Sequence, residues 1–170
     1  MNMKFLCLIL GLLCFNIATG QNKVNIEKEM KFAEMQLALM LKAHPDTTKF
    51  PFSVDDNGNL KDRSSSWWCS GFFPGSLWYL YEYTNNPVWK KSARLWTDAL
   101  AKEQFNKSTH DLGFMLYCSF GNAYRLLPDT ADKKVLLNGA VSLATRYNPQ
   151  SKLIKSWDSF EGYEFPVIID

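Results

Sequence analysis

The chain has 170 residues, the size of a single domain, and 46% of them are hydrophobic, which is enough to build a buried core. Its 12 Phe, 7 Tyr and 6 Trp residues, together with a formal net charge of only +2, exclude an intrinsically disordered chain. The lysines and arginines are scattered along the sequence, so a nucleic-acid partner is not expected either.

Residues 1–20 have the pattern of a secretory signal peptide. Lys4 gives a positive start, residues 5–15 are almost entirely apolar, and residues 18–20 are small, as a signal peptidase requires. The apolar run is shorter than the roughly 20 residues of a membrane-spanning helix, and no later segment resembles a span. We therefore expect a cleaved signal and a secreted or periplasmic mature domain, residues 21–170.

A lipoprotein anchor at Cys14 is the alternative for this segment. It is disfavoured because Leu13, directly before the cysteine, is bulkier than the residue that lipid-attachment signals normally accept.

The mature chain is predicted to consist of helices separated by polar loops. Apolar residues recur at helical spacing over residues 26–43, with charged residues on the other side. Turn residues and prolines divide the remainder, and they bound further predicted helices over 74–83, 88–105, 109–126 and 131–146. Residues 44–66 are predicted to be a long irregular segment with a tight turn at Asn57-Gly58, because they are rich in Pro, Asp, Asn and Ser.

No segment shows clear strand alternation, so the predicted class is all-α. Successive helix-loop-helix units favour a solenoid or a toroid of helical hairpins. The last stretch, residues 157–170, begins as a loop and ends on the apolar run 167–169 and Asp170, where a further helix would be expected to continue.

The segment 67–78 is the first candidate site. Neighbouring residues on a helix diverge by about 100°, so Trp67 and Trp68 cannot both face one core, and one of them is expected to face a cleft. An exposed indole suits the binding of a sugar. Gly71 and Gly75 allow either a close approach of another backbone or unusual dihedral angles. The alternative is an aromatic seam of the core.

Asp111 and Asp170 are candidate catalytic carboxylates. Asp111 stands at the head of an apolar helix, directly after His110, where its alternative role is a helix cap. Asp170 follows an apolar run, so it is either a cap or a partly buried carboxylate with a raised pKa, as a general acid requires. Paired carboxylates are the usual apparatus of proton transfer to a sugar.

The two cysteines of the mature chain, Cys69 and Cys118, carry no spacing pattern. They form either one disulfide or two buried thiols. Because the chain has only two histidines and no CxxC motif, we expect neither a metal site nor a cofactor.

Three motifs together resemble the unsaturated glucuronyl hydrolases of glycoside hydrolase family 88. They are Trp68-Cys69-Ser70-Gly71-Phe72-Phe73-Pro74-Gly75 with Leu77-Trp78, then His110-Asp111-Leu112-Gly113-Phe114, and finally Val167-Ile168-Ile169-Asp170. The resemblance covers residues 27–170. It implies an (α/α)6 barrel of six helical hairpins, with the active site at the mouth formed by the inner helices.

The resemblance also implies a reaction and roles for four residues. The family hydrates the vinyl ether of a 4,5-unsaturated uronic acid at the non-reducing end of lyase-generated glycosaminoglycan fragments. By match to the motifs, Asp170 is the general acid and base and Asp111 is the second essential carboxylate. Trp68 is the aromatic platform for the substrate, and His110 flanks the site.

The chain is about half as long as the family's barrel requires. We therefore expect an amino-terminal portion that stops at the start of the sixth helix, is inactive by itself and self-associates through exposed apolar flanks. Two other functions stay open: an unsaturated rhamnogalacturonyl hydrolase of the related family 105, and an exported, non-catalytic carbohydrate-binding helical module.

Overall fold

The computed structural model describes residues 25–168. The predicted signal peptide with Cys14, and Asp170, lie outside the described residues. Helix α2 (Ile26–Ala43) has the bounds that its periodicity predicted. Within residues 25–33, the Asn25 side chain accepts a hydrogen bond from the Lys28 amide at 3.1 Å, and Lys31 pairs with Glu27 one turn away at 2.9 Å.

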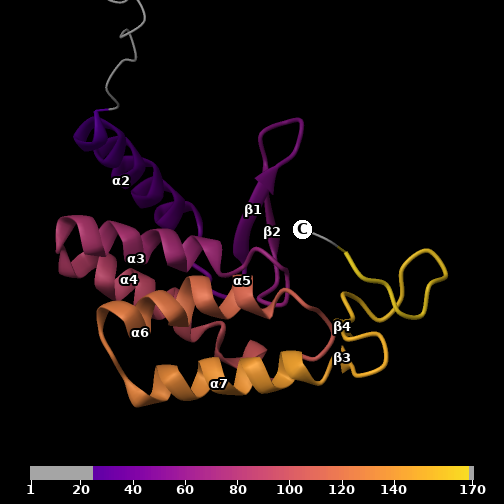
Figure 1. Ribbon diagram of the computed structural model, residues 1–170. Coiled ribbons are helices and arrows are strands. Elements are labelled where there is room, and N and C mark those ends of the chain that lie inside the picture. The colour runs from indigo at the N-terminus through magenta and orange to yellow at the C-terminus, as the bar shows by residue number, and fades with distance from the viewer. Residues whose placement is uncertain (1–24, 169–170) are drawn as a thin grey trace, which may run out of the picture. The chain divides into compact units, whose positions relative to one another are not determined.

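Residues 34–168 contain a β-hairpin, a series of helices and a second, very short hairpin (Figure 1). In chain order the elements after α2 are β1 (Phe50–Val54), β2 (Leu60–Arg63), α3 (Phe72–Thr84), α4 (Pro87–Asp98), the 3-10 helix η1 (Ala101–Phe105), α5 (Leu112–Leu116), the π-helical turn η2 (Tyr117–Gly121), α6 (Asn122–Leu126), α7 (Thr130–Ala144), β3 (Tyr147–Asn148) and β4 (Leu153–Ile154).

The predicted all-α class is confirmed, with three local differences. The helix expected over 88–105 breaks after Asp98 and resumes as η1. The helix expected over 109–126 starts at Leu112 and contains the π turn η2 between α5 and α6. Residues 44–66 were expected to be irregular throughout, whereas β1 and β2 form an antiparallel pair there.

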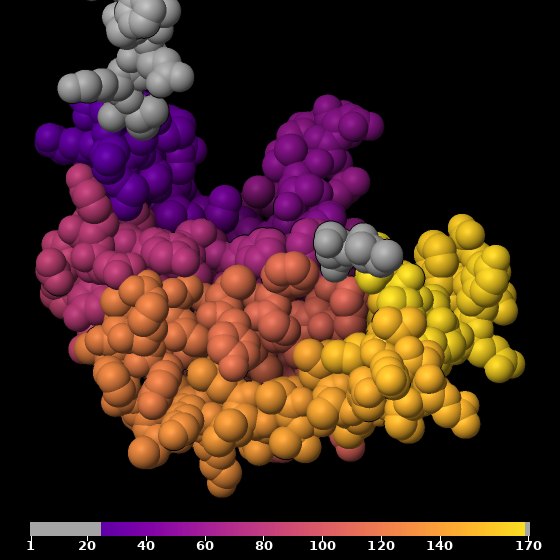
Figure 2. All heavy atoms as spheres, in the orientation of Figure 1, coloured from indigo at the N-terminus to yellow at the C-terminus, as the bar shows by residue number. Residues whose placement is uncertain are grey.

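The β1–β2 hairpin forms because its turn satisfies its own polar groups. The Asp55 carboxylate accepts hydrogen bonds from the amides of Asn57 and Asn59 at 2.9 and 2.8 Å, and Gly58 takes the left-handed conformation (φ 80°). The predicted Asn57-Gly58 turn is thus confirmed. The strands themselves are too short, and too interrupted by Pro51 and a bulge, to show alternation in the sequence. The hairpin stands clear of the surrounding surface in Figure 2.

The helix ends follow the sequence signals. Asn85 closes α3 in a left-handed conformation (φ 55°), and the Asn86 side chain caps α4 by accepting a hydrogen bond from the Val88 amide at 3.0 Å. Pro87 occupies the first turn of α4. At the start of α7 the Asp129 side chain accepts a hydrogen bond from the Ala131 amide at 2.7 Å. These caps fix where the α3–α4 hairpin turns and where α7 begins.

Aromatic side chains from the hairpin and from α3 and α4 make the core. The Trp96 ring packs edge-to-face against Phe73 and Phe50, with centroids 4.8 and 5.3 Å apart. Trp78 is fully buried, and its indole N–H donates to the Thr97 hydroxyl at 2.9 Å, so this core contains a satisfied polar group. Helix α7 packs against α5, η1 and η2 on the other side of the α5–α6 segment from α3 (Figure 1).

Candidate functional site

Two glycines bring the start of α3 against the start of α5. A Cβ atom on Gly71 would lie 2.1 Å from the Phe114 carbonyl oxygen, and one on Gly75 would lie 2.7 Å from the Cys118 carbonyl oxygen. The backbones are therefore in direct contact, as the glycine spacing allowed. Gly71 has a φ of −76°, which any residue adopts, so the close approach and not the dihedral angle requires glycine there.

This contact makes α3 and the α5–α6 segment run in the same direction. At their far ends Arg125 of α6 pairs with Glu82 of α3 through two hydrogen bonds of 2.6 and 2.7 Å. Because the two segments are parallel, the residues that precede them lie at the same end of the structure. Trp68 precedes α3 and Asp111 precedes α5, so two of the predicted site residues are brought to one end.

Trp68 lies at this end in an exposed aromatic cluster. Its ring makes edge-to-face contacts with Phe72 and Phe114, at centroid distances of 5.7 and 6.1 Å, and Phe72 and Phe114 also meet at 5.7 Å. All three rings are 40 to 42% exposed. Trp68 is therefore not part of a buried seam, and the rim of the cluster offers an indole to a ligand.

Trp67 and Trp68 diverge, as neighbouring residues must. Trp67 is also exposed, but its ring faces the hairpin and meets Phe52 at 5.8 Å, while Trp68 faces α5. The structure agrees with the expectation that one of the two indoles faces a cleft, because Trp68 lines a groove, and neither indole is buried. Two hydrogen bonds anchor the loop that carries the two tryptophans. Ser65 donates to the buried Glu103 carboxylate at 2.5 Å, and Ser70 donates to the Ser65 carbonyl at 2.7 Å.

The Asp111 carboxylate does not cap its helix. It makes no hydrogen bond to the α5 backbone amides and instead accepts one from the Thr109 hydroxyl at 2.7 Å. Its other oxygen lies 3.5 Å from Nε2 of His110. The carboxylate is 13% exposed, so it is shielded from bulk solvent without being used by the helix. The side-chain cap that was the alternative role of Asp111 is therefore not formed, although the residue occupies the N-cap position of α5.

His110 connects this end to the last described residues. Its backbone amide and its Nδ1 both lie 3.1 Å from the Ser156 carbonyl oxygen. Ser156 in turn donates its amide to the Pro166 carbonyl at 2.8 Å, and its hydroxyl accepts from the Ile168 amide at 2.9 Å. Pro166 and Ile168 are thereby linked through Ser156 to His110, the residue that precedes Asp111.

Sequence reasoning missed two residues of this arrangement. Ser156 is a buried polar residue, and Trp157 meets His110 edge-to-face at 5.4 Å. A tryptophan in an otherwise polar loop was a signal for Trp157, whereas a lone serine carries none. His110 and Ser156 line a cavity of about 350 Å³ with Val167 and Ile168, which is distinct from the groove lined by Trp68.

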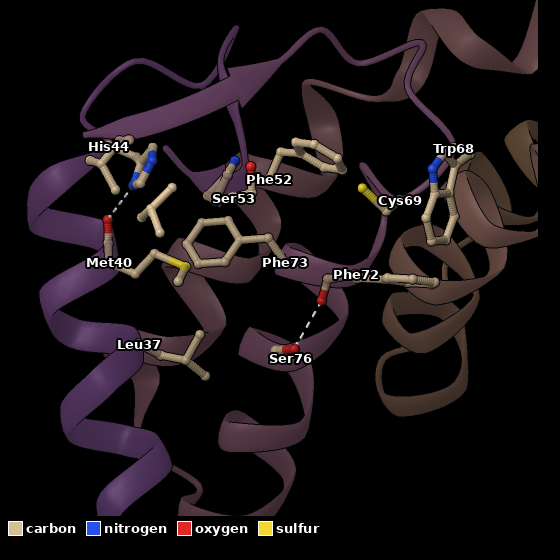
Figure 3. A pocket seen from close by; sticks show the side chains of 13 residues that line it. Leu37, Met40, His44, Phe52, Ser53, Trp68, Cys69, Phe72, Phe73 and Ser76 are labelled. Atoms are coloured by element: carbon tan, nitrogen blue, oxygen red, sulfur yellow. Dashed lines mark hydrogen bonds between the residues drawn. The ribbon is translucent and has the colours of Figure 1, made fainter. Parts of the chain in front are cut away.

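The groove beside Trp68 is larger, about 600 Å³, and mostly apolar. In Figure 3 Phe52, Cys69 and Phe73 lie between Trp68 at one end and His44 at the other. His44 is buried and satisfied, with Nδ1 donating to the Met40 carbonyl at 2.9 Å and Nε2 lying 2.9 Å from the Asp62 carboxylate of β2. The hairpin thus forms one wall of this groove.

Cys69 and Cys118 are free, half-buried thiols, so the disulfide alternative is not realised. Burial raises the pKa of each thiol, which keeps both protonated at neutral pH. Among residues 25–168 no three His, Cys, Asp or Glu side chains are grouped so that they could hold a metal ion. Within the same residues, no helix is long and apolar enough to cross a membrane.

No protein-family model matches the chain. Individual curated proteins do match it, over most of its length. An unsaturated glucuronyl hydrolase of Formosa agariphila is 37% identical over 98% of this chain and 44% of its own length. An unsaturated chondroitin disaccharide hydrolase of Streptococcus agalactiae is 26% identical over 87% of this chain and 38% of its own length.

A solved structure agrees with these relatives. The crystal structure of an unsaturated glucuronyl hydrolase specific for heparin superimposes with a TM-score of 0.77 and 42% identity, over 83% of this chain and 38% of that one. The chain thus spans less than half the length of the proteins it matches. It is therefore a relative of the unsaturated glucuronyl hydrolases over the part of those proteins that it spans, and its helical hairpins form part of their (α/α)6 fold.

Proposed function

We propose that the full-length protein removes the 4,5-unsaturated uronic acid from the non-reducing end of lyase-generated glycosaminoglycan oligosaccharides. One observation carries the proposal. Trp68 and Asp111, from two motifs more than 40 residues apart, lie at the same end of two parallel helices whose backbones touch. An exposed indole at the same end of the structure as a shielded carboxylate suits a sugar that needs both stacking and a hydrogen-bonding anion.

Asp170 is the general acid and base in this proposal. Its carboxylic acid protonates C4 of the unsaturated sugar while water adds to C5, and the carboxylate regains a proton from that water. The resulting hemiketal opens and releases the neighbouring sugar. Ser156 donates to the Pro166 carbonyl, accepts from the Ile168 amide and is itself bonded to His110, so the segment 166–168 is linked to the residue before Asp111, which supports pairing the Asp170 motif with Asp111 in this proposal.

Asp111 and Trp68 position the substrate. The Asp111 carboxylate is oriented by the Thr109 hydroxyl and keeps further lone pairs with which it accepts hydrogen bonds from the uronate ring. Trp68 supplies a flat apolar face to the sugar, and His110 flanks the site. Because Asp111 makes no cap, binding a sugar does not compete with the stability of α5.

The substrate class follows from the named relatives. One is specific for heparin and another acts on unsaturated chondroitin disaccharides, and both polymers carry sulfated amino sugars. We therefore propose sulfated disaccharides with an unsaturated uronate as substrates. Export through residues 1–20 would place the enzyme where such fragments arise, and amino-terminal sequencing of the mature protein checks that cleavage.

The test is hydration by the full-length protein. Unsaturated heparin and chondroitin disaccharides are incubated with it, and loss of the alkene absorbance is followed. Asp170→Asn and Asp111→Asn are expected to lose turnover and keep the fold, whereas the control Asp56→Asn, in the exposed hairpin turn, is expected to behave as wild type. Turnover by Asp170→Asn would place the general acid elsewhere. An unchanged alkene with retained binding would instead indicate a carbohydrate-binding module.

A further inference from the structure

Arg63 is held in an aromatic corner at the end of β2. Its guanidinium carbon lies 4.8 Å from the centre of the Phe52 ring and 5.1 Å from the centre of the Trp67 ring. These two rings meet edge-to-face, 5.8 Å apart and at 81° to each other. Contacts of this kind restrict a long side chain that is otherwise mobile on the surface, so the charge is positioned before any ligand arrives.

The guanidinium keeps its hydrogen-bonding capacity. Aromatic contacts use the charge and the faces of the group, while its five N–H donors lie in the plane. Within the described residues, neither a carboxylate nor a carbonyl oxygen accepts a hydrogen bond from this side chain, although it is exposed. The planar donors match the oxygens of a sulfate or a carboxylate, which arginine binds through two parallel hydrogen bonds.

The corner borders the groove that Trp68 lines. Phe52, one wall of the corner, is also a wall of that groove, and Figure 3 shows it on the far side of Cys69 from Trp68. Trp67, the other wall, directly precedes Trp68 in the same loop. Phe52 is thus shared between the Arg63 corner and the groove that Trp68 lines, and this shared wall is what links the corner to a sugar bound at Trp68.

We propose that Arg63, held by Phe52 and Trp67, binds an anionic group, a sulfate ester, on the second sugar of the substrate. This inference rests on the proposed function, because it takes the sugar at Trp68 to be the unsaturated uronate. It adds a residue that selects among substrates by charge outside the reacting ring. The hairpin then serves as a recognition element, which explains why an exposed hairpin carries aromatic residues and an arginine that no described residue pairs.

The experiment compares Arg63→Gln with Lys61→Gln in the full-length protein. Both variants remove one positive charge from β2, but it is Arg63 that lies over the two aromatic rings of the corner. KM and kcat are measured for a sulfated and an unsulfated unsaturated disaccharide of the same linkage. We expect Arg63→Gln to raise KM about tenfold for the sulfated substrate only, the loss of one charge-assisted hydrogen-bonded contact. Lys61→Gln is expected to leave both values within about twofold, the effect of one unpaired surface charge.

Two readouts separate the inference from the proposed function. Equal changes for both substrates, or equal effects of the two variants, would overturn the role of Arg63 while leaving hydration intact. If the wild type hydrates neither disaccharide, the proposed function fails, and calorimetric binding of the same two disaccharides decides the inference alone. A sulfate-dependent affinity that Arg63→Gln abolishes supports the site, and an affinity that is indifferent to sulfate or to Arg63 overturns it.

Discussion

Replacing Gly71 by alanine tests the contact on which the candidate site depends. The added Cβ would lie 2.1 Å from the Phe114 carbonyl oxygen and 2.3 Å from the Met115 carbonyl oxygen. Carbon and oxygen atoms that are not bonded require roughly 3.2 Å or more, so α3 and α5 would have to separate by about 1 Å. Both obstructing atoms belong to the backbone, and therefore no change of rotamer relieves the clash.

The expected cost is large for a single methyl group. Inserting a methylene into a packed interior typically costs 1–3 kcal/mol, and here two backbone atoms resist, so we expect about 3 kcal/mol. Gly113 provides the matched control, because a Cβ there would meet nothing within 4 Å. Gly113→Ala lies within α5 and should gain about 0.5–1 kcal/mol from the lower backbone entropy of alanine.

Urea unfolding of the full-length protein, followed by circular dichroism, measures the difference. The urea midpoints of the two variants should lie on opposite sides of the wild-type midpoint, with unchanged slopes. Their free energies of unfolding should differ by about 4 kcal/mol, compared with the 5–15 kcal/mol of a typical domain. Equal midpoints for Gly71→Ala and Gly113→Ala would refute direct backbone contact. The alignment of Trp68 with Asp111 would then lose its physical basis.

Three further outcomes are expected. Trp68→Ala should weaken substrate binding by about 1–3 kcal/mol with little change in melting temperature, since the residue is 42% exposed. An unfolded variant would instead indicate that Trp68 is a core residue. Asp132→Asn should cost about 2 kcal/mol in chemical denaturation, because Asp132 is 5% exposed and holds Arg94 of α4 through bonds of 2.8 and 2.7 Å. Asp98→Asn, which removes an exposed 3.4 Å contact to the same arginine, should cost less than about 0.5 kcal/mol; equal losses would contradict the burial argument. Because burial raises the pKa of Cys69 and of Cys118, alkylation of both thiols should be slow at neutral pH. The reaction should accelerate as the pH rises through the elevated pKa, or when urea unfolds the chain. Rapid labelling of the native protein at pH 7 would show that the thiols are not shielded.

Local signals were sufficient for much of the fold. Helix periodicity predicted α2 to the residue, and Asn85, Asn86 and Pro87 marked the turn between α3 and α4. The Asn57-Gly58 turn was found although the strands on either side were not. A two-stranded pair with a bulge and a proline is stabilised by its turn and by contacts with distant residues such as Trp96, which a local pattern does not contain.

The sequence by itself determined the helical class, the turn between α3 and α4 and the motifs that resemble the unsaturated glucuronyl hydrolases. These properties depend on residues within a few positions of each other, through capping, periodicity and turn geometry. The roles of individual side chains in the site were decided by tertiary structure. The contact of His110 with the Ser156 carbonyl, 46 residues away, is the kind of interaction that links the end carrying Asp111 to the last described residues, and no local pattern contains it.

Tertiary contacts also decided which residues share an end of the molecule. Gly71 and Gly75 permitted either strain or close approach, and the carbonyl oxygens of Phe114 and Cys118 select close approach. Arg63 was an ordinary surface charge in the sequence until the hairpin placed it against Phe52 and Trp67. Such placements depend on packing between segments far apart in the chain, whose energies arise only when the folded backbone brings them together.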